Sequence, residues 1–367
     1  MLKNSLFFLL FVIMTSKKPD VYFTKDISPK KMVEMFKKLN IELKGNVALK
    51  VHTGELGGPY FLRPDFLQDI YDYTNGTFVE CNTAYKRYRH STEEHEKVLQ
   101  ANGWLENNRR TIIMDEKPEN DFNLTLSNYK MISENIVGEH LKDFDSCLVL
   151  AHFKGHRWGG YGGALKQLSI GFASQAGKTW IHTAGVTTNW TEMVQYRASQ
   201  ENFTAAMADA ALSIIDYFKK KGNIAYINVL VNISTRCDCG GIEAPEPKIH
   251  DMGILVSTDP VAIDKACIDM IKNTTDPGTE EWLEQLDSLL GENTIKIAEE
   301  LGIGNQDYNF IDVDASGGDE KEKASSFLWL YILLGIIGLI LIGVTVFLVF
   351  SKCSKIKDDD LIAQINE

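Results

Sequence analysis

The sequence predicts an α/β protein with a mostly parallel central sheet flanked by helices, plus one C-terminal transmembrane helix. Two patterns carry this prediction. Short segments that are apolar throughout, rather than alternating, recur between helical patterns, and such segments are typical of strands buried on both faces of a parallel sheet. Near the C-terminus, residues 327–350 form a run of 24 uncharged residues. The 367 residues, 44% of them hydrophobic, are enough to bury a full core.

In the first half of the chain, compact apolar runs alternate with helical patterns. Ser28 followed by Pro29 marks one helix start, and Ser91 with Glu94 three residues later forms the pattern of a capping box. We therefore expect strands at residues 21–23, 47–52, 77–81 and 111–114, and helices at residues 28–39, 64–73 and 91–102.

The same alternation continues in the second half of the chain. Asp259 and Pro260 form a turn that starts a helix, with the carboxylate in the capping position. We expect strands at residues 146–151, 224–233, 253–256 and 309–313, and helices at residues 203–219, 263–271, 280–290 and 292–301. The folded domain then covers residues 20–314, and residues 315–326 form a polar stalk.

The uncharged run at residues 327–350 predicts a membrane span. At 1.5 Å per residue, its helix would be roughly 36 Å long, enough to cross a hydrocarbon core with some tilt. A helix in a soluble core would carry a polar face, and this segment has none. Lys352, Lys355 and Lys357 follow the span, so we expect residues 351–367 to be a cytoplasmic tail and the folded domain to be extracellular or lumenal.

The N-terminus fits this topology. Residues 1–16 contain Lys3 and an apolar run at residues 6–14, the layout of a cleaved signal peptide. A buried N-terminal strand is the alternative, because no small-x-small cleavage site follows. A glycoprotein is expected from six Asn-x-Ser/Thr sequences, at Asn75, Asn123, Asn189, Asn202, Asn232 and Asn273.

Charge and cysteine content narrow the function classes. The net charge of −12 and a pI of about 5.2 give no basic surface for nucleic acid, so we expect no nucleic-acid partner. Five cysteines precede the span, an odd number for an oxidising compartment. Cys237 and Cys239 are too close to bridge each other without strain, so at least one thiol stays free or binds a ligand. Cys353, next to the span, is a candidate for palmitoylation.

Residues 151–182 hold a glycine-rich stretch with three histidines and three lysines. A phosphate loop is excluded, because Phe172 stands where the motif needs its first glycine; a dinucleotide fingerprint is excluded by Leu165 in place of the third glycine. Glycines still expose backbone N–H groups to an anion, and Lys154, Lys166 and Lys178 could complete such a cradle. The alternative is a tight packing loop with solvated lysines.

A metal site is a second interpretation of this stretch. His152 and His156 are four residues apart, His182 ends the stretch, and the Cys237-x-Cys239 pair offers two soft ligands for zinc, copper or iron-sulfur. Buried thiols without a metal are the alternative.

Polar residues follow several predicted strands, where ligands bind in open α/β sheets. Lys50, His52 and Glu55 follow one strand, and Glu80, Asn82 and Tyr85 follow another. We expect one composite site there. Glu55 and Glu80 are the candidate acid-base residues, since carboxylates in closed sites can be tuned towards neutral pKa values. His52 could instead be a satisfied core histidine.

Several ordered motifs then match one known family. They are His152-Phe-Lys-Gly-His156, Gly162-Gly-Ala-Leu-Lys166, Gly177-Lys178 with His182, Cys237-Asp-Cys239, Asp259-Pro-Val-Ala-Ile-Asp264, Lys50-Val-His-Thr-Gly-Glu55, Glu80-Cys-Asn-Thr-Ala-Tyr85, Arg89 and His95. With these motifs, residues 20–314 resemble the family called domain of unknown function 362 (DUF362), whose members are often labelled iron-sulfur-center proteins. The resemblance implies an α/β fold and a site, but no established reaction.

The chain departs from this family at one point. Typical members carry a ferredoxin-like insert with a C-x2-C-x2-C-x3-C-P pattern that holds a four-iron cluster. Residues 183–211, where that insert follows, contain no cysteine. A four-iron cluster is therefore not expected here.

The predicted function is that of a membrane-anchored protein whose site binds a metal or a small anionic ligand, either as an enzyme or not. The metal, a transition metal, would be held by His152, His156, His182, Cys237 and Cys239. The anionic ligand would be held by Lys154, Lys166, Lys178, Asn82, Tyr85 and Arg89. The alternative is a cell-surface binding or structural protein that kept the fold without the iron-sulfur module. A soluble electron carrier is disfavoured, because the cluster pattern is absent.

Overall fold

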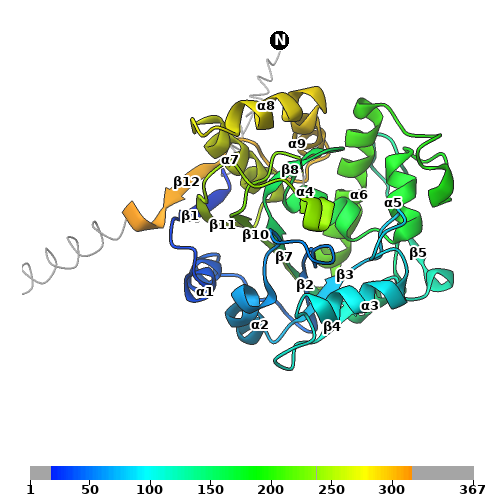
Figure 1. Cartoon of the computed structure of the whole chain (residues 1–367), viewed down its shortest axis with the longest axis horizontal. Helices are drawn as coiled ribbons and strands as arrows, with labels where there is room; N and C mark the ends of the chain where they lie inside the picture. Colours follow the sequence, from blue (N-terminus) through cyan, green and yellow to red (C-terminus); the bar gives the residue numbers. More distant parts are fainter. Residues whose placement is uncertain (1–17, 237, 316–367) are drawn as a thin grey trace, which may run out of the picture. The chain divides into compact units, whose positions relative to one another are not determined.

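An eight-stranded sheet runs through the protein, with helices on both of its faces (Figure 1). The computed structural model describes residues 18–236 and 238–315, apart from the side chains of residues 238 and 239. In sheet order the strands are β12 (Asn309–Asp312), β1 (Asp20–Thr24), β11 (Gly253–Ser257), β10 (Ile224–Leu230), β7 (Ser146–His152), β2 (Val47–Lys50), β3 (Thr77–Glu80) and β4 (Thr111–Ile113). This sheet belongs to one compact unit that ends at Asp312.

Strand direction confirms the mostly parallel sheet. Among these eight strands, only β11 is antiparallel to its neighbours, β1 and β10. The other adjacent pairs are parallel. Strands β2, β3, β7, β10 and β11 are buried at every residue, which explains why their sequences are apolar without alternation.

Helices begin where the sequence offers capping residues. The side chain of Ser28 accepts a hydrogen bond from the N–H of Lys31, and Ser91 does the same for Glu94. Asp259 caps its helix by accepting from Val261 and Ala262. The α-helices are α1 (Pro29–Lys38), α2 (Gln68–Thr74), α3 (Thr92–Ala101), α4 (Ala164–Lys166), α5 (Gln175–His182), α6 (Gln200–Lys221), α7 (Pro260–Lys272), α8 (Thr279–Ser288) and α9 (Gly291–Glu300).

The helices form two layers over the sheet. Helix α1 packs on β1 and β11 and on α2, whereas α6 and α7 pack on β7, β10 and β11. Figure 1 shows α1 and α2 on one side of the strands and α7, α8 and α9 on the other. The predicted helix at residues 64–73 is one helix only in part, because residues Pro64–Leu67 form a 3-10 turn before α2.

Two small hairpins were not predicted. Strand β5 (Phe122–Thr125) pairs with β6 (Glu134–Val137), and β8 (Lys154–His156) pairs with β9 (Gly160–Gly162), each antiparallel. Strands β8 and β9 are three residues long and contain three glycines, one lysine and one histidine, so no apolar pattern reveals them.

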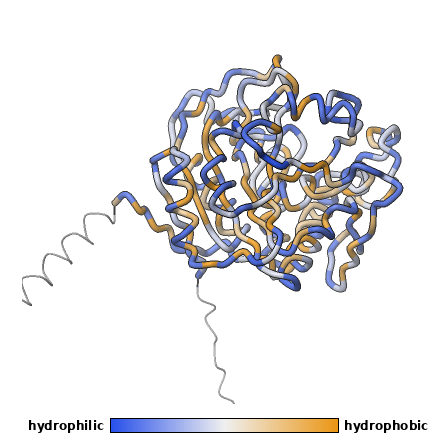
Figure 2. Tube along the Cα trace, turned by 90° about the horizontal axis from the view of Figure 1, so that it is seen from below, coloured by the Kyte–Doolittle hydropathy of each residue, from blue (hydrophilic) through white to orange (hydrophobic). Residues whose placement is uncertain are grey.

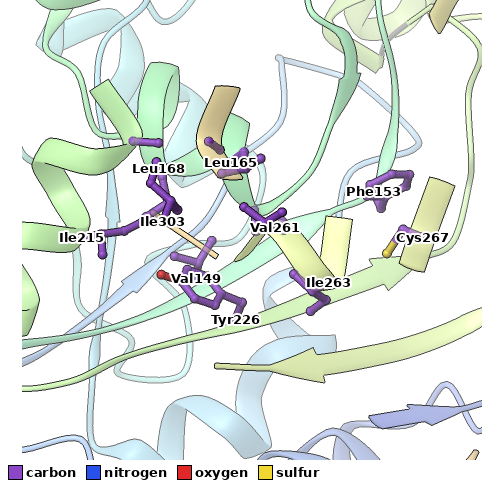
Figure 3. Packing of buried hydrophobic residues seen from close by; sticks show 14 of the residues in the cluster. Val149, Phe153, Leu165, Leu168, Ile215, Tyr226, Val261, Ile263, Cys267 and Ile303 are labelled. Carbon is purple, nitrogen blue, oxygen red and sulfur yellow. The ribbon is translucent and has the colours of Figure 1, made fainter. Parts of the chain in front are cut away.

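The main core fills the space between the sheet and the α4, α6 and α7 layer. Val149 and Tyr226 from the sheet meet Leu165, Ile215 and Val261 from the helices (Figure 3). Apolar segments lie inside the fold and polar segments lie outside (Figure 2). A second cluster, which includes Ile132, Ile170, Ala173, Ile181 and Phe203, lies between α5 and α6.

Several predicted segments lie outside the described residues. They are the signal peptide at residues 1–16, the transmembrane helix at residues 327–350, the tail at residues 351–367 with Cys353, and the stalk at residues 315–326 apart from its first residue. Within the described part of the chain, no helix is both long and apolar enough to span a bilayer. The membrane span therefore stays a prediction.

Candidate functional site

A cavity of about 510 Å³ opens at the carboxyl ends of β2, β3 and β7. This is the edge where ligands bind in open α/β sheets. The cavity is lined by His52, Glu80, Thr83, Ala84, Tyr85, Arg87, Arg89, His152, Lys154, His156, Arg157, Trp158, Gly162, Gly163, Lys166, Gln167, Ile170, Gly171, Lys178, His182, Met193, Val194, Gly240, Glu243 and Pro245. Most of the residues singled out from the sequence thus meet at one place.

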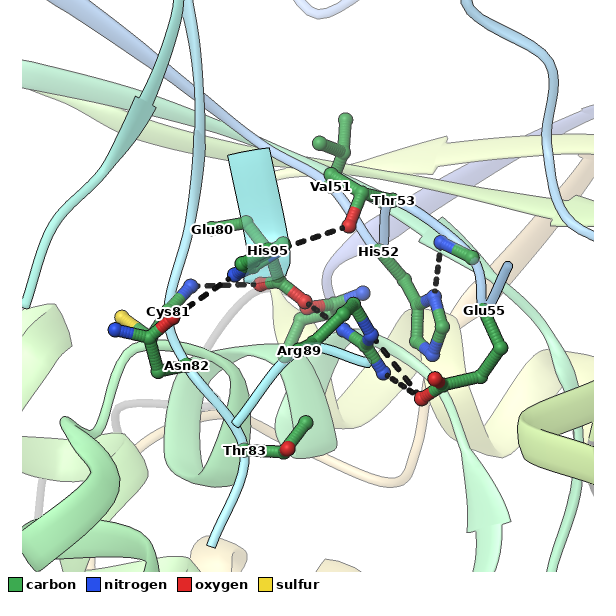
Figure 4. A network of polar contacts seen from close by, with 12 residues as sticks. Val51, His52, Thr53, Glu55, Glu80, Cys81, Asn82, Thr83, Arg89 and His95 are labelled. Carbon is green, nitrogen blue, oxygen red and sulfur yellow. Dashed lines mark hydrogen bonds and ion pairs between the residues drawn. The ribbon is translucent and has the colours of Figure 1, made fainter. Parts of the chain in front are cut away.

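A buried chain of four alternating charges lies at one wall of the cavity, and Figure 4 shows its Glu80, Arg89 and Glu55 members. The Nη2 atom of Arg89 is 2.7 Å from Oε1 of Glu55, and its Nη1 atom is 3.0 Å from Oε1 of Glu80. The Nζ atom of Lys50 forms an ion pair with the other oxygen of Glu80 and donates to Oε1 of Gln167 at 2.9 Å. The four groups cancel one another in charge.

This network lowers the pKa of Glu80, one of the two candidate acid-base carboxylates. Burial pushes the pKa of Glu80 upwards, but the charges of Lys50 and Arg89 outweigh it, so the pKa lies below its usual value. That direction is opposite to the tuning towards neutral expected for an acid-base group. Glu55 does not line the cavity; its Oε1 atom accepts from Arg89 and from the hydroxyl of Tyr85 at 3.0 Å.

The three lysines of the glycine-rich stretch are not solvated. Lys154 and Lys178 are only 4% and 6% exposed, and Lys166 is half-buried. Burial lowers the pKa of Lys154 well below its usual value, and the charge of Lys166 adds to this. Burial likewise lowers the pKa of Lys166 to about 8. Keeping Lys154 and Lys166 charged at this wall is therefore costly, and a bound anion would relieve that cost.

Two glycines of the stretch lie beside lysine side chains of the site. A Cβ atom on Gly162 would lie 3.7 Å from Cδ of Lys166 and 3.9 Å from Cγ of Lys154, so both lysine stems pass over this glycine. At Gly171, a Cβ atom would lie 2.5 Å from Oε1 of Gln167 and 3.2 Å from Nζ of Lys50. A side chain at this position would therefore have to displace the Gln167 amide and would crowd the end of Lys50.

A π-helical turn presents one face to the cavity. Helix α4 continues directly into a π-helix at Gln167–Gly171, and Lys166, Gln167, Ile170 and Gly171 all line the cavity. The start of α4 is held by Asp264, whose carboxylate accepts from the N–H groups of Ala164 and Leu165 at 2.7 and 2.9 Å. Turns of this kind occur often at functional sites.

Hydrogen bonds decide the tautomers of the cavity histidines. The Nδ1 atom of His52 accepts from the N–H of Gly54 at 2.9 Å, and Nδ1 of His156 accepts from two backbone N–H groups. Each neutral ring therefore carries its hydrogen on Nε2. In His182, Nδ1 donates to the carbonyl of Lys178 at 2.7 Å, so Nε2 keeps a lone pair.

All of these imidazoles are neutral at ordinary pH. Burial lowers the pKa of His156 and His52 well below the usual value, and it lowers the pKa of His182 to about 4 and of His152 to about 3. In His152, Nε2 donates to the carbonyl of Val231 at 2.6 Å. Among the rings that line the cavity, His52 and His156 thus carry a hydrogen on Nε2 that they can donate, and His182 carries an Nε2 lone pair that can accept.

The predicted metal ligands are only partly described. His152, His156 and His182 all line the cavity, but Cys237 and the side chain of Cys239 lie outside the described residues. Within the described residues, no group of three or more His, Cys, Asp and Glu side chains is arranged to hold a metal ion. The described cysteines, Cys81, Cys147 and Cys267, are buried free thiols whose pKa burial raises.

Two predicted ligand residues have different surroundings. Tyr85 lines the cavity, and burial raises the pKa of its hydroxyl to about 12. Asn82 does not line it: its amide donates to Thr92 at 3.0 Å, and its Oδ1 atom lies 3.1 Å from Nδ1 of His95. Asn82 therefore supports the loop after β3 rather than facing the cavity.

Sequence reasoning missed one wall of the cavity. This wall consists of Trp158, Ile170, Met193 and Val194. Ile170 belongs to the second hydrophobic cluster, and Trp158 packs against that cluster. No motif marks these residues. The hint that was available is Trp158 itself, a large aromatic residue between the glycines of a stretch otherwise rich in charge.

One family model and several solved structures are similar to parts of this chain. A family model described as "Domain of unknown function (DUF362)" matches residues 47–269. None of the curated proteins matches the chain. Among solved structures, the lactate racemase apoprotein from Thermoanaerobacterium thermosaccharolyticum is 15% identical, with a TM-score of 0.34 over 57% of this chain and 50% of that one. A protein of Thermotoga maritima is 12% identical, with a TM-score of 0.36 over 74% and 58%. The chain thus spans about half the length of these structures.

Proposed function

The chain belongs to the DUF362 family, and we propose that its α/β core forms a binding site for a small anionic ligand. The observation that carries this proposal is a surplus of basic side chains at the cavity. The charges of Lys50, Glu80, Arg89 and Glu55 cancel within their own network. Lys154, Lys166 and Lys178 add three further basic side chains to the same cavity.

Neutral hydrogen-bond donors add to the groups that can bind an anion in the cavity. The Nε2–H groups of His52 and His156 belong to rings that line the cavity, and neither ring gains a charge at ordinary pH. Ammonium and imidazole N–H groups in a partly closed site are the usual partners of carboxylate and phosphate oxygens. A ligand with one or two oxyanion groups matches this set.

The test is anion binding by the full chain. Isothermal titration calorimetry with phosphate, sulfate and acetate, each as its sodium salt, should detect at least one of them. Lys166→Gln should weaken that binding about tenfold, the loss of roughly one charged hydrogen bond. Lys97→Gln, at a lysine exposed on α3, is the matched control and should bind like the unchanged protein. Binding of no anion, or equal binding by both variants, would contradict the proposal.

Acid-base chemistry in the same cavity would make the protein an enzyme. His182 offers an Nε2 lone pair there, next to the cationic groups. A non-catalytic binding protein is the alternative. The two differ in the fate of a bound anion: solvent-hydrogen exchange at a bound carboxylic acid in D2O, lost in His182→Gln, supports an enzyme, whereas unchanged ligand supports a binding protein.

Metal binding is the second candidate function. It is supported by three histidines that line the cavity together with Gly240, the neighbour of Cys239. The tautomer of His156 weighs against it, because Nδ1 already accepts backbone hydrogen bonds and Nε2 carries the hydrogen. Elemental analysis of the anaerobically purified chain, beside a Cys237→Ser, Cys239→Ser double variant, decides this. Absence of stoichiometric metal in both proteins removes the candidate.

Membrane anchoring completes the proposal. It is supported by the uncharged run at residues 327–350 and the lysines that follow it. The asparagines of the six Asn-x-Ser/Thr sequences are exposed, except for the half-buried Asn232, which suits glycosylation in the secretory pathway. Enzymatic deglycosylation should therefore increase the mobility of the protein on a gel. Unchanged mobility would count against a lumenal or extracellular domain.

A further inference from the structure

The cavity lining holds two chemically different sets of residues, which we name the basic end and the apolar end after their side chains. The basic end consists of Lys154, Lys166 and Lys178, from β8, α4 and α5. The other carries Trp158, Ile170, Met193 and Val194, which come from the segment after β8, the π-turn and the segment before α6. Oxyanion groups suit only the first end.

The apolar end is built on the second hydrophobic cluster. Ile170 is part of that cluster and Trp158 packs against it. The indole of Trp158 meets the ring of His182 edge-on at 5.1 Å, and His182 in turn stacks on Phe203 at 4.8 Å. Arg197 lies over the Trp158 ring at 4.2 Å. The indole is therefore held in a fixed orientation at the cavity wall.

Apolar surface at this end is open to water. Val194 lines the cavity and is 76% exposed, although its neighbour Met193 is buried. Trp158 is half-buried. Covering such surface with an apolar group is favourable in proportion to the area removed from water.

The size of the cavity also exceeds the needs of a bare anion. A volume of about 510 Å³ lies within the range of pockets for drug-sized ligands, roughly 300 to 1,000 Å³. A phosphate or carboxylate group alone would leave the Trp158 and Val194 end filled with water.

We propose that the ligand is an amphiphilic oxyanion, a carboxylate or phosphate attached to an apolar, preferably aromatic, body. The oxyanion lies against Lys154, Lys166 and Lys178, and the body lies against Trp158, Met193 and Val194. This proposal rests on the proposed anion site and adds the class of molecule that the site selects.

The test compares matched pairs of anions on the full chain in lipid nanodiscs at pH 7.5. Phosphate is compared with phenyl phosphate, and acetate with phenylacetate, by calorimetry. In the pair whose head group binds, the aromatic member should bind about tenfold more tightly, because the ring covers the apolar end. Whichever pair binds also identifies the head group as phosphate or carboxylate.

Two variants locate the effect. Val194→Gln places a neutral polar side chain at the apolar end and should remove most of the tenfold preference while the bare anion binds within about twofold of the unchanged protein. Val186→Gln is the matched control, because Val186 is also exposed, at 60%, but does not line the cavity. It should leave both affinities unchanged.

The possible failures are distinguishable. If neither member of either pair binds, the anion site itself is wrong. If both members of a pair bind with equal affinity, or if Val194→Gln weakens the bare and the aromatic anion alike, the anion site stands and the amphiphilic ligand is wrong. Loss of the preference in Val186→Gln as well as in Val194→Gln would also overturn the assignment of the apolar end.

Discussion

The Nδ1 atom of His156 accepts a hydrogen bond from the backbone N–H of Gly159 at 3.1 Å. A backbone N–H can only donate, so the neutral ring must carry its hydrogen on Nε2. We predict that 15N spectra of histidine-labelled protein show His52 and His156 as Nε2–H tautomers and His182 as the Nδ1–H tautomer.

These rings should also stay neutral between pH 8 and pH 5, since burial lowers their pKa values. His140 is the internal control: burial there is outweighed by hydrogen bonding to Asp143, its pKa is raised, and its signal should titrate. Protonation of His156 above pH 6 would contradict the arrangement.

Arg89 joins two buried carboxylates, so its loss should be costly. Arg89→Met leaves Glu55 and Glu80 without their shared partner and should lower the free energy of unfolding by about 3 to 5 kcal/mol, measured by urea denaturation. Adding Glu55→Gln to this variant should recover about 1 to 2 kcal/mol, because one stranded charge is removed.

The comparison for Arg89 is an exposed ion pair. Lys97→Met breaks the contact with Glu93 on the surface of α3 and should cause no measurable change. If Arg89→Met is as mild as Lys97→Met, the buried network does not stabilise the fold as described.

Anion affinity should depend on the protonation of Lys166. Because burial lowers its pKa to about 8, the empty protein loses this positive charge as the pH rises through 8. Affinity for sulfate, which keeps its charge over this range, should therefore be steady below pH 7.5 and fall by up to about tenfold per pH unit above pH 8.

Lys166→Gln should flatten this pH profile between pH 7.5 and 9. The same substitution has a second readout in stability. In the unchanged protein, the lowered pKa penalises folding below pH 8, and the penalty fades as the pH rises towards the unfolded lysine value of about 10.5. The variant should therefore be the more stable protein at pH 7, with the difference shrinking above pH 8. A steady stability difference up to pH 10 would contradict the lowered pKa.

Gly155 should not tolerate a side chain. A Cβ atom there would lie 1.7 Å from the carbonyl oxygen of Thr235, so Gly155→Ala must push β8 away from the segment that follows β10. We expect a loss of about 3 kcal/mol in thermal or urea denaturation. Gly159→Ala, in the same hairpin, meets its nearest atom only at 3.6 Å and should change stability by less than about 0.5 kcal/mol. Equal effects of the two substitutions would argue against the close contact.

The sheet could be predicted because strands that are buried on both faces have mostly apolar sequences. Strands β2, β3 and β10 fall within the predicted ranges, and β7 extends one residue beyond its predicted range, to His152. Every residue in these strands is buried, and most of them are apolar. The hairpin of β8 and β9 has no such apolar sequence. It is held in place partly by Thr235, about 80 residues away in the chain, and no local pattern records that contact.

The residues of the site could be predicted from their chemical types, but the ion pairs that they form could not. Lysines and histidines in a glycine-rich stretch indicate a site, and nine of the thirteen predicted site residues line one cavity, among them Lys154, Lys166 and His156. The sequence could not reveal that Arg89 neutralises Glu55 and Glu80, because partners in a fold are chosen by three-dimensional distance. The apolar wall was missed for the same reason, since Val194 resembles any surface valine.

The first and last strands pair in parallel, with Phe23 opposite Asp312. Since β1 is antiparallel to β11, and β11 to β10, strand β12 points in the same direction as β10 and β7. The polypeptide therefore leaves the domain at the same edge of the sheet that carries the cavity.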